Sequence, residues 1–161
     1  MNPTVMGAWQ RTLECARALA SRLVLFQCPA RFTPTRENTA NLRTFFHRAT
    51  RAPREREDLV FVWEPRGNWD RGQVREICEE LTLVHAVDPF QQPPITPGLA
   101  YLRLHGKTGC RYRYTTSDLE ELLRIARSYA SCYVHFNNIS MVEDAREFQR
   151  LASRARRDFP A

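Results

Sequence analysis

The sequence predicts an α/β fold with a mainly parallel sheet of five strands, and two observations carry that prediction. Five short apolar runs recur along the chain, and segments with helical periodicity lie between most of them. The runs are apolar at nearly every position, which is typical of strands in a sheet that helices cover on both faces. This alternation indicates parallel strands joined by helical crossovers.

The expected strands are rich in branched and aromatic side chains, which fit a pleated and buried surface. Each run is short and finishes in polar residues, so each is interpreted as one strand. Their sequences are LVLFQC from Leu23, LVFVWE from Leu59, LTLVHAVD from Leu81, LAYLRLHG from Leu99 and CYVHFNN from Cys132.

Five segments have the periodicity or the start signals of helices. The first two are Trp9 to Ser21 and Glu37 to about Arg51, the second with apolar residues at helical spacing. The third extends from Asp70, placed as an N-cap, to about Glu80. The last two begin in SDLE at Ser117 and SMVE at Ser140, which both fit the capping box.

The connection between the third and fourth expected strands differs from the others. The segment PFQQPPITPG, residues 89 to 98, holds four prolines. Because proline lacks the backbone N–H that a helix interior needs, we expect a stretched loop here instead of a helix.

Length and composition indicate a single domain over residues 1–161. A chain of 161 residues can bury a core, and 43% hydrophobic with 26% charged residues is ordinary for a globular protein. No apolar run approaches the roughly 20 residues that cross a bilayer, and the N-terminal segment lacks the order of a signal peptide. We therefore expect a cytoplasmic protein without a membrane partner.

The net charge of +6 gives only weak support for a nucleic-acid partner. Arginine accounts for 23 of the 24 basic residues, and Lys107 is the only lysine. A bias this strong fits coding composition or surface ion pairs better than a phosphate-binding role. Five cysteines with wide spacing and no C-x-x-C pattern indicate neither a disulfide framework nor a zinc site.

Polar side chains gather at the C-terminal end of every expected strand, where α/β folds bind their ligands. Arg103 and His105 alternate with leucines, so they share one face of their strand with Tyr101. A buried Arg and a buried His need partners, and we expect the carboxylates of Glu64 and Asp88 to supply them. The strand-end residues are Gln27, Glu64, Arg66, Asp88, Arg103, His105, Asn137 and Asn138.

Several ordered motifs resemble the domain of unknown function 72, the YecE-like family. They are FQCPARFTPTRENTANLRTFF, WEPRGNW, VDPF, YLRLHG and YVHFNN followed by MVEDA, and the resemblance extends from about Trp9 to Leu151. It implies a barrel related to the (β/α)8 type, of which these motifs resemble strands four to eight. The family's first three strands have no counterpart here, so we expect a partial TIM-like barrel. The family's activity is unassigned, so the resemblance supplies no substrate.

An incomplete barrel leaves two sheet edges and an apolar inner face uncovered. We therefore expect the chain to form a homo-oligomer or to bind a separate chain that supplies the missing strands.

The strand ends together suggest an enzyme-like site for a phosphorylated or otherwise anionic ligand. Glu64, Asp88 and His105 are the candidate acid, base and proton carrier, and arginines at the same ends suit bidentate binding of phosphate or carboxylate. Carboxylates and histidine also bind divalent metals, but the arginines among them oppose a cation, so no metal or other cofactor is assigned. The candidate ligand-binding residues are Gln27, Arg66, Trp69, Arg103, Tyr114, Asn137 and Asn138.

Each candidate also has a purely structural interpretation, in which the polar residues pair with one another and terminate the strands. Tyr112 and Tyr114 either stack on a ligand ring or pack their own loop. Two alternatives for the whole chain remain: a nucleic-acid-binding protein that uses the same strand ends, and a non-catalytic fragment or half of a complex. A basic stripe on the last helix and an arginine-rich loop bear on the first alternative; they consist of Arg146, Arg150, Arg154 and Arg157, and of Arg48, Arg51, Arg54 and Arg56.

Overall fold

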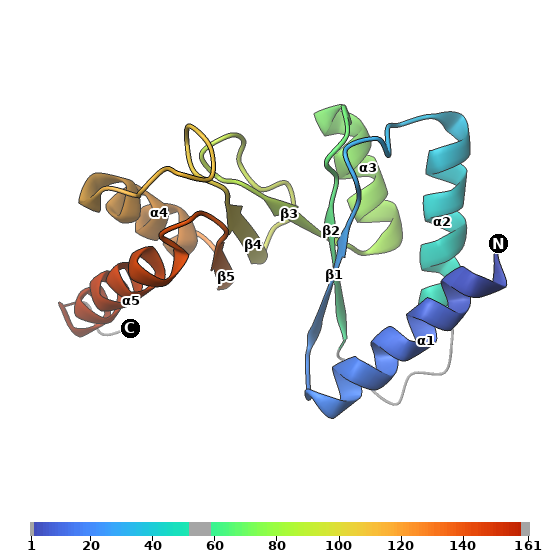
Figure 1. Ribbon diagram of the computed structural model, residues 1–161, viewed down its shortest axis with the longest axis horizontal. Helices are drawn as coiled ribbons and strands as arrows, with labels where there is room; N and C mark the ends of the chain where they lie inside the picture. Colours follow the sequence, from blue (N-terminus) through green and yellow to red (C-terminus); the bar gives the residue numbers. More distant parts are fainter. Residues whose placement is uncertain (1, 52–58, 159–161) are drawn as a thin grey trace. The chain divides into compact units, whose positions relative to one another are not determined.

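The computed structural model describes residues 2–51 and 59–158, in which helices and strands alternate along most of the chain (Figure 1). In chain order the elements are α1 (Pro3–Ala18), β1 (Leu23–Gln27), α2 (Arg36–Arg51), β2 (Val60–Glu64), α3 (Arg71–Leu81), β3 (Val84–Val87), β4 (Leu99–Leu104), α4 (Thr116–Arg127), β5 (Ser131–Phe136) and α5 (Met141–Asp158).

The strands pair in their sequence order, β1-β2-β3-β4-β5, and every pairing is parallel. This arrangement confirms the α/β class with five parallel strands. The strand β3 is shared, because Val84 and His85 pair with β2 whereas Ala86 and Val87 pair with β4.

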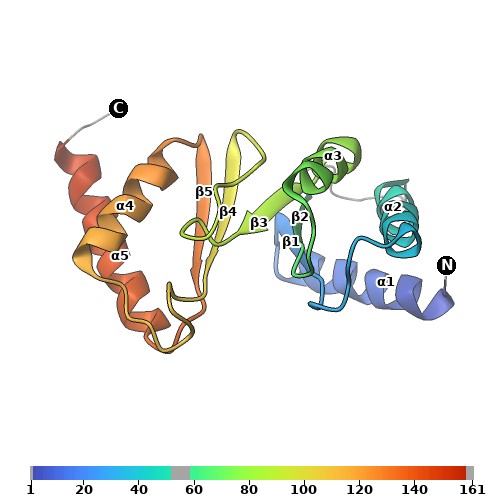
Figure 2. The ribbon, with the colours of Figure 1, turned by 90° about the horizontal axis from the view of Figure 1, so that it is seen from above.

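The chain forms two compact units, Met1–His85 and Ala86–Ala161. The core of the first unit is a cluster of aromatic rings from α1, β1, α2 and β2. Ring centroids lie 4.9 Å apart for Phe26 and Phe46, and 5.4 Å apart for Trp9 and Phe61. Edge-to-face ring pairs of this kind stabilise by about 0.5–1.5 kcal/mol beyond their burial. The cluster holds α1 and α2 against one face of β1 and β2 (Figure 2).

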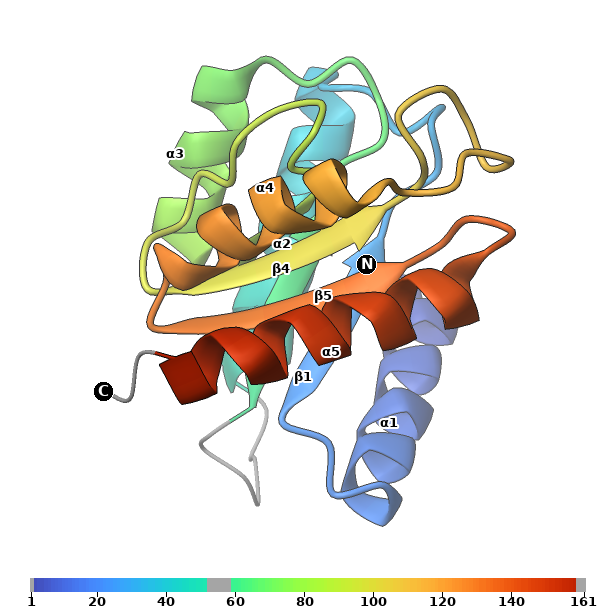
Figure 3. The ribbon, with the colours of Figure 1, turned by 90° about the vertical axis from the view of Figure 1, so that its left-hand side faces the viewer.

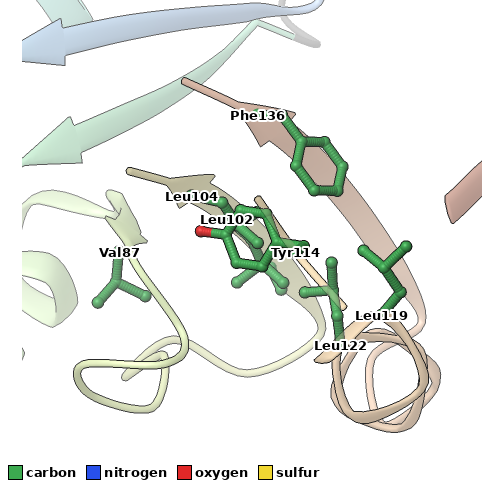
Figure 4. Close-up of a cluster of buried hydrophobic side chains, with 8 residues drawn as sticks. Val87, Leu102, Leu104, Tyr114, Leu119, Leu122 and Phe136 are labelled. Atoms are coloured by element: carbon green, nitrogen blue, oxygen red, sulfur yellow. The ribbon is translucent and has the colours of Figure 1, made fainter. Parts of the chain in front are cut away.

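The second unit has its own core between the β4–β5 pair and the helices α4 and α5 (Figures 3 and 4). Alternate residues of β4 supply it, since Ala100, Leu102 and Leu104 are fully buried on one face of the strand. The remaining members are Val87, Tyr114, Leu119, Leu122 and Phe136. The other face of β4 is thus left to Tyr101, Arg103 and the following His105, as the alternation predicted.

The ends of α3 confirm one prediction and correct another. Asp70 is the N-cap, and its capping box with Gln73 is complete. At the other end, the helix continues to Leu81 and closes on Thr82, whose φ of 54° is left-handed. The expected strand from Leu81 was therefore wrong at its start: β3 begins only at Val84, because the apolar run also contains the last buried residue of α3.

The start of α4 lies two residues before the predicted position. Thr115, not Ser117, is the N-cap, and its partner in the capping box is Asp118. The sequence TTSDLE contains several Ser and Thr residues, and Thr115 is the one with extended backbone angles. The start of α5 agrees with the prediction, since the helix begins at Met141, directly after Ser140. The segment 89–98 contains no helix, as expected.

Candidate functional site

Glu64 and Gln27 form the polar strand ends of the first unit. They lie opposite each other in the β1–β2 register, and the Gln27 Nε2 donates to Glu64 Oε1 at 3.3 Å. Only 6% of Glu64 is exposed, which makes it a buried carboxylate that needs such donors. Arg66 Nε lies 3.9 Å from the same oxygen, on a side chain that is half exposed. The pair expected at this strand end is present, and its length and exposure indicate a weak interaction.

Trp69 joins two loops at the same end of the first unit. Its Nε1 donates to the backbone oxygen of Phe32 at 2.8 Å, and its ring stacks on the Phe32 ring at 6.0 Å. Gly67 lies so close to the Phe32 oxygen that a Cβ there would approach it to 2.6 Å. This placement gives Trp69 a packing role between the loops that follow β1 and β2.

Cys28, which the sequence did not single out, lies between these groups. The Nε1 of Trp63 donates to its Sγ at 3.3 Å. Burial raises the pKa of the Cys28 thiol, the Trp63 hydrogen bond opposes that rise, and the charge of Glu64 adds to it. The thiol is therefore protonated at neutral pH and is unsuited to act as a nucleophile.

Asp88 fixes the strand ends of the second unit through backbone bonds. It is 8% exposed, and its carboxylate accepts from the N–H of Phe90 at 3.1 Å and from the N–H of His105 at 3.0 Å. The expected link between Asp88 and His105 exists, but it is made with the His105 backbone. This arrangement ties the end of β4 to the end of β3 through the backbone of His105.

Arg103 lies opposite His135 in the β4–β5 register, on the face that the core does not use. The ring of His135 stacks on Tyr101 with centroids 4.6 Å apart, and the ring of Tyr133 follows at 6.2 Å from Tyr101. Partial burial lowers the pKa of His135, and the charge of Arg103 lowers it further. This face therefore combines a guanidinium, a neutral imidazole and, at the end of β4, the half-buried His105.

Tyr114 lies in the core of the second unit, as Figure 4 shows. Its hydroxyl accepts from the N–H of Gly106 at 2.8 Å, and its ring stacks on Phe90. Burial raises the pKa of the hydroxyl above its usual range. Of the two interpretations of Tyr114, this position fits loop packing better than stacking on a ligand.

The two asparagines after β5 have different surroundings. Asn137 is exposed. Asn138 is 2% exposed, and its Nδ2 donates to the backbone oxygen of Tyr112 at 2.7 Å and to Asp144 Oδ2 at 2.6 Å. Asp144 also accepts from the N–H of Tyr114. Asn138 therefore holds the first turn of α5 to the preceding loop, whereas Asn137 faces solvent.

Lys107 and Asp118 hold the loop that contains Tyr112 against the start of α4. Asp118 accepts from Lys107 Nζ at 2.5 Å, from the Tyr112 hydroxyl at 2.7 Å and from the Thr115 N–H at 2.8 Å. Burial raises the pKa of Asp118, but these donors outweigh burial and hold the pKa well below its usual range. The only lysine of the chain is thus occupied by a structural carboxylate.

The basic stripe on α5 is exposed at Arg146, Arg150 and Arg154. Arg150 pairs with Glu147 at 2.8 Å within the helix. The side chains of Arg51 and Arg157 lie outside the described residues, as do Arg54 and Arg56 altogether. No group of three or more His, Cys, Asp or Glu within residues 2–51 and 59–158 is placed to hold a metal ion. None of the helices described is both long and apolar enough to span a membrane.

The family model described as "Protein of unknown function DUF72" matches residues 3–161. The chain belongs to this family. Solved structures of DUF72 proteins from Enterococcus faecalis V583 and Thermotoga maritima MSB8 share its fold, with TM-scores of 0.69 and 0.68 at 22% and 19% identity. Each comparison covers 90% of this chain, which spans only 65% and 64% of those DUF72 chains. No curated protein matches the chain.

The match confirms the expected partial TIM-like barrel, because about a third of the length of each DUF72 structure lies outside the part that this chain covers. Within the described part, the sequence missed His135 as a candidate. Its signal is the alternation in CYVHFNN, which puts His135 on the same face as Tyr133 and Asn137. Only the β4–β5 register, which the sequence does not contain, brings it opposite Arg103.

Proposed function

We propose that the second unit binds a phosphorylated or otherwise anionic small molecule at the carboxyl ends of β4 and β5. The observation that carries the proposal is the position of Arg103, half-buried and opposite His135 on the face not used by the core. A half-buried guanidinium at a strand end suits bidentate contact with phosphate or carboxylate.

His135 and His105 extend this surface with groups that can exchange protons. The lowered pKa keeps His135 neutral at pH 7, so its imidazole can accept or donate one hydrogen bond to a ligand hydroxyl or ester oxygen. These residues suit general acid–base chemistry on a bound phosphate ester.

The test is isothermal titration calorimetry, which measures the affinity of the chain for sulfate, inorganic phosphate and a hexose phosphate. Arg103→Ala should weaken anion binding at least tenfold, whereas Arg124→Ala, an exposed arginine on α4, should leave it unchanged. Sulfate keeps its charge as the pH falls, so its binding should tighten at acidic pH as His135 gains a proton. His135→Gln should remove that tightening. Equal affinities for the parent and Arg103→Ala would refute the proposal.

A nucleic-acid ligand is the second candidate, and the exposed stripe of Arg146, Arg150 and Arg154 favours it. These residues line an open groove of about 420 Å³ on α5. A single-stranded oligonucleotide should then bind with an affinity that falls steeply as salt rises. Loss of that binding in the triple alanine variant, with sulfate binding retained, would assign the two ligands to different surfaces.

A further inference from the structure

The helices α4 and α5 contact each other beside the β4–β5 pair (Figure 3). A pocket of about 400 Å³ lies between the start of α4 and the first turns of α5. Binding sites for small molecules commonly have volumes of about 300–1,000 Å³. The lining residues all come from the two helices and from the loop before α4, so the pocket is separate from the surface around Arg103.

Asp144 gives this pocket a buried carboxylate with one oxygen unused. The residue lines the pocket and is only 3% exposed. Its Oδ2 accepts from Asn138 Nδ2 at 2.6 Å and from the N–H of Tyr114 at 3.4 Å. Its Oδ1 accepts no hydrogen bond from any residue that the structure describes. Because a buried carboxylate oxygen without a donor is costly, this oxygen suits a donor group on a molecule that enters the pocket.

The wall that α5 contributes is a charged helix face in which one pair is already satisfied. Glu143, Arg146, Glu147 and Arg150 occupy positions i, i+3, i+4 and i+7, so they share one face of α5. Glu147 and Arg150 pair with each other at 2.8 Å. Glu143 and Arg146 form no ion pair with any described residue. One carboxylate and one guanidinium of this wall therefore remain for a ligand.

Arg113 supplies a second guanidinium from the loop before α4. It is exposed, and it has no ion-pair partner within residues 2–51 and 59–158. The pocket thus presents two guanidinium groups, from Arg113 and Arg146, and two carboxylates outside ion pairs, from Glu143 and Asp144. A ligand with a single charge would meet as many like charges as opposite charges there. A ligand that carries both charges can satisfy both sets.

We propose that this pocket binds a small zwitterion of the α-amino acid class. Its ammonium group, with three donors, bonds Asp144 Oδ1 and the carboxylate of Glu143. Its carboxylate accepts from Arg113 and Arg146, since the parallel N–H groups of a guanidinium match the two carboxylate oxygens. Leu119, which is buried and lines the same pocket, offers an apolar contact for the carbon skeleton. This site lies outside the anion site proposed above and does not depend on it.

Isothermal titration calorimetry of the full chain tests the requirement for both charges. L-alanine, L-leucine, L-glutamate and L-lysine represent small, apolar, acidic and basic side chains, and at least one of them should bind with one site per chain. Its N-acetyl derivative lacks the ammonium group and its amide lacks the carboxylate. Each derivative should bind about tenfold more weakly or worse, as expected when hydrogen bonds to a charged group are lost. No binding of any of the four at millimolar concentration, or equal binding of a derivative, would overturn the proposal.

Variants of exposed residues locate the site without disturbing the fold. Glu143→Gln and Arg146→Gln should each weaken amino-acid binding about tenfold. Glu120→Gln and Arg124→Gln are the matched controls, because both residues are exposed on α4 outside the pocket lining, and they should leave the affinity unchanged. Arg103→Ala should also leave it unchanged, which separates this site from the anion site. Equal effects of the lining and control variants, or loss of amino-acid binding in Arg103→Ala, would refute the assignment to this pocket.

Discussion

Protonation of His85 should destabilise the first unit as the pH falls. His85 lies in the part of β3 that pairs with β2. It is opposite Trp63 in that register, and it is 1% exposed. Burial lowers its pKa to about 4, and the charge of Arg71 contributes in the same direction. The folded chain therefore resists a proton that the unfolded chain accepts at an ordinary pKa near 6.5.

Proton linkage gives the sign and the size of this change in the free energy of unfolding. A histidine whose folded pKa is depressed contributes stability that is present above the unfolded pKa and is lost as the pH falls toward the folded pKa. With pKa values of about 6.5 unfolded and about 4 folded, the free energy of unfolding should drop by about 2 kcal/mol between pH 7 and pH 5. The loss should level off below pH 4, when both states are protonated.

Urea unfolding at pH 7, 6 and 5, followed by tryptophan fluorescence, measures this drop. The parent should lose about 2 kcal/mol more than His85→Gln over that range, whereas His47→Gln should keep the parent's pH dependence. His47 is a suitable control because its side chain is 54% exposed in the same unit. A proton NMR titration of the parent gives a second readout that needs no variant. Parallel pH profiles for the parent and His85→Gln, or an imidazole that titrates near pH 6.5, would refute the reasoning.

Two further predictions concern stability. Asn138→Ala should lower the free energy of unfolding by about 2–3 kcal/mol, because it removes two hydrogen bonds from a buried site and leaves Asp144 with fewer donors. Asn137→Ala, at an exposed position, should change the free energy of unfolding by no more than about 0.5 kcal/mol. Equal losses for the two variants in urea unfolding would contradict the structural role of Asn138. Thr82→Gly should stabilise the chain by about 1 kcal/mol, because an exposed β-branched residue at a φ of 54° is strained there; a lower melting temperature in calorimetry would be the contrary result.

The strands and helices could be predicted because their signals are local. Burial on both faces makes a parallel strand a continuous apolar run, and Asp70 needs only its own backbone neighbours to cap α3. The errors also have local causes. The run from Leu81 combined the end of α3 with β3, since both are apolar, and only the left-handed backbone of Thr82 separates them.

The candidate site could be predicted only in part, because it depends on register. Alternation along one strand placed Arg103 and His105 on one face. It could not show that His135 comes opposite Arg103, since a shift of the neighbouring strand by two residues would leave both sequences unchanged and alter the pair. Sequence also cannot tell whether a carboxylate bonds a side chain or a backbone N–H, which is the difference found at Asp88.

The adjacent residues Asn137 and Asn138 show what distinguishes a structural polar residue from one available to a ligand. The two are the same residue type, at the end of the same strand, and nothing in the sequence ranks them. Because Asn138 faces the core side, it meets the first turn of α5 and must satisfy Asp144 and the Tyr112 carbonyl. Asn137 shares its face with Tyr133 and His135, where the helices do not reach. The same division separates Tyr114 from Arg103, so the face opposite the helices is where the groups that bind the proposed anion should be sought.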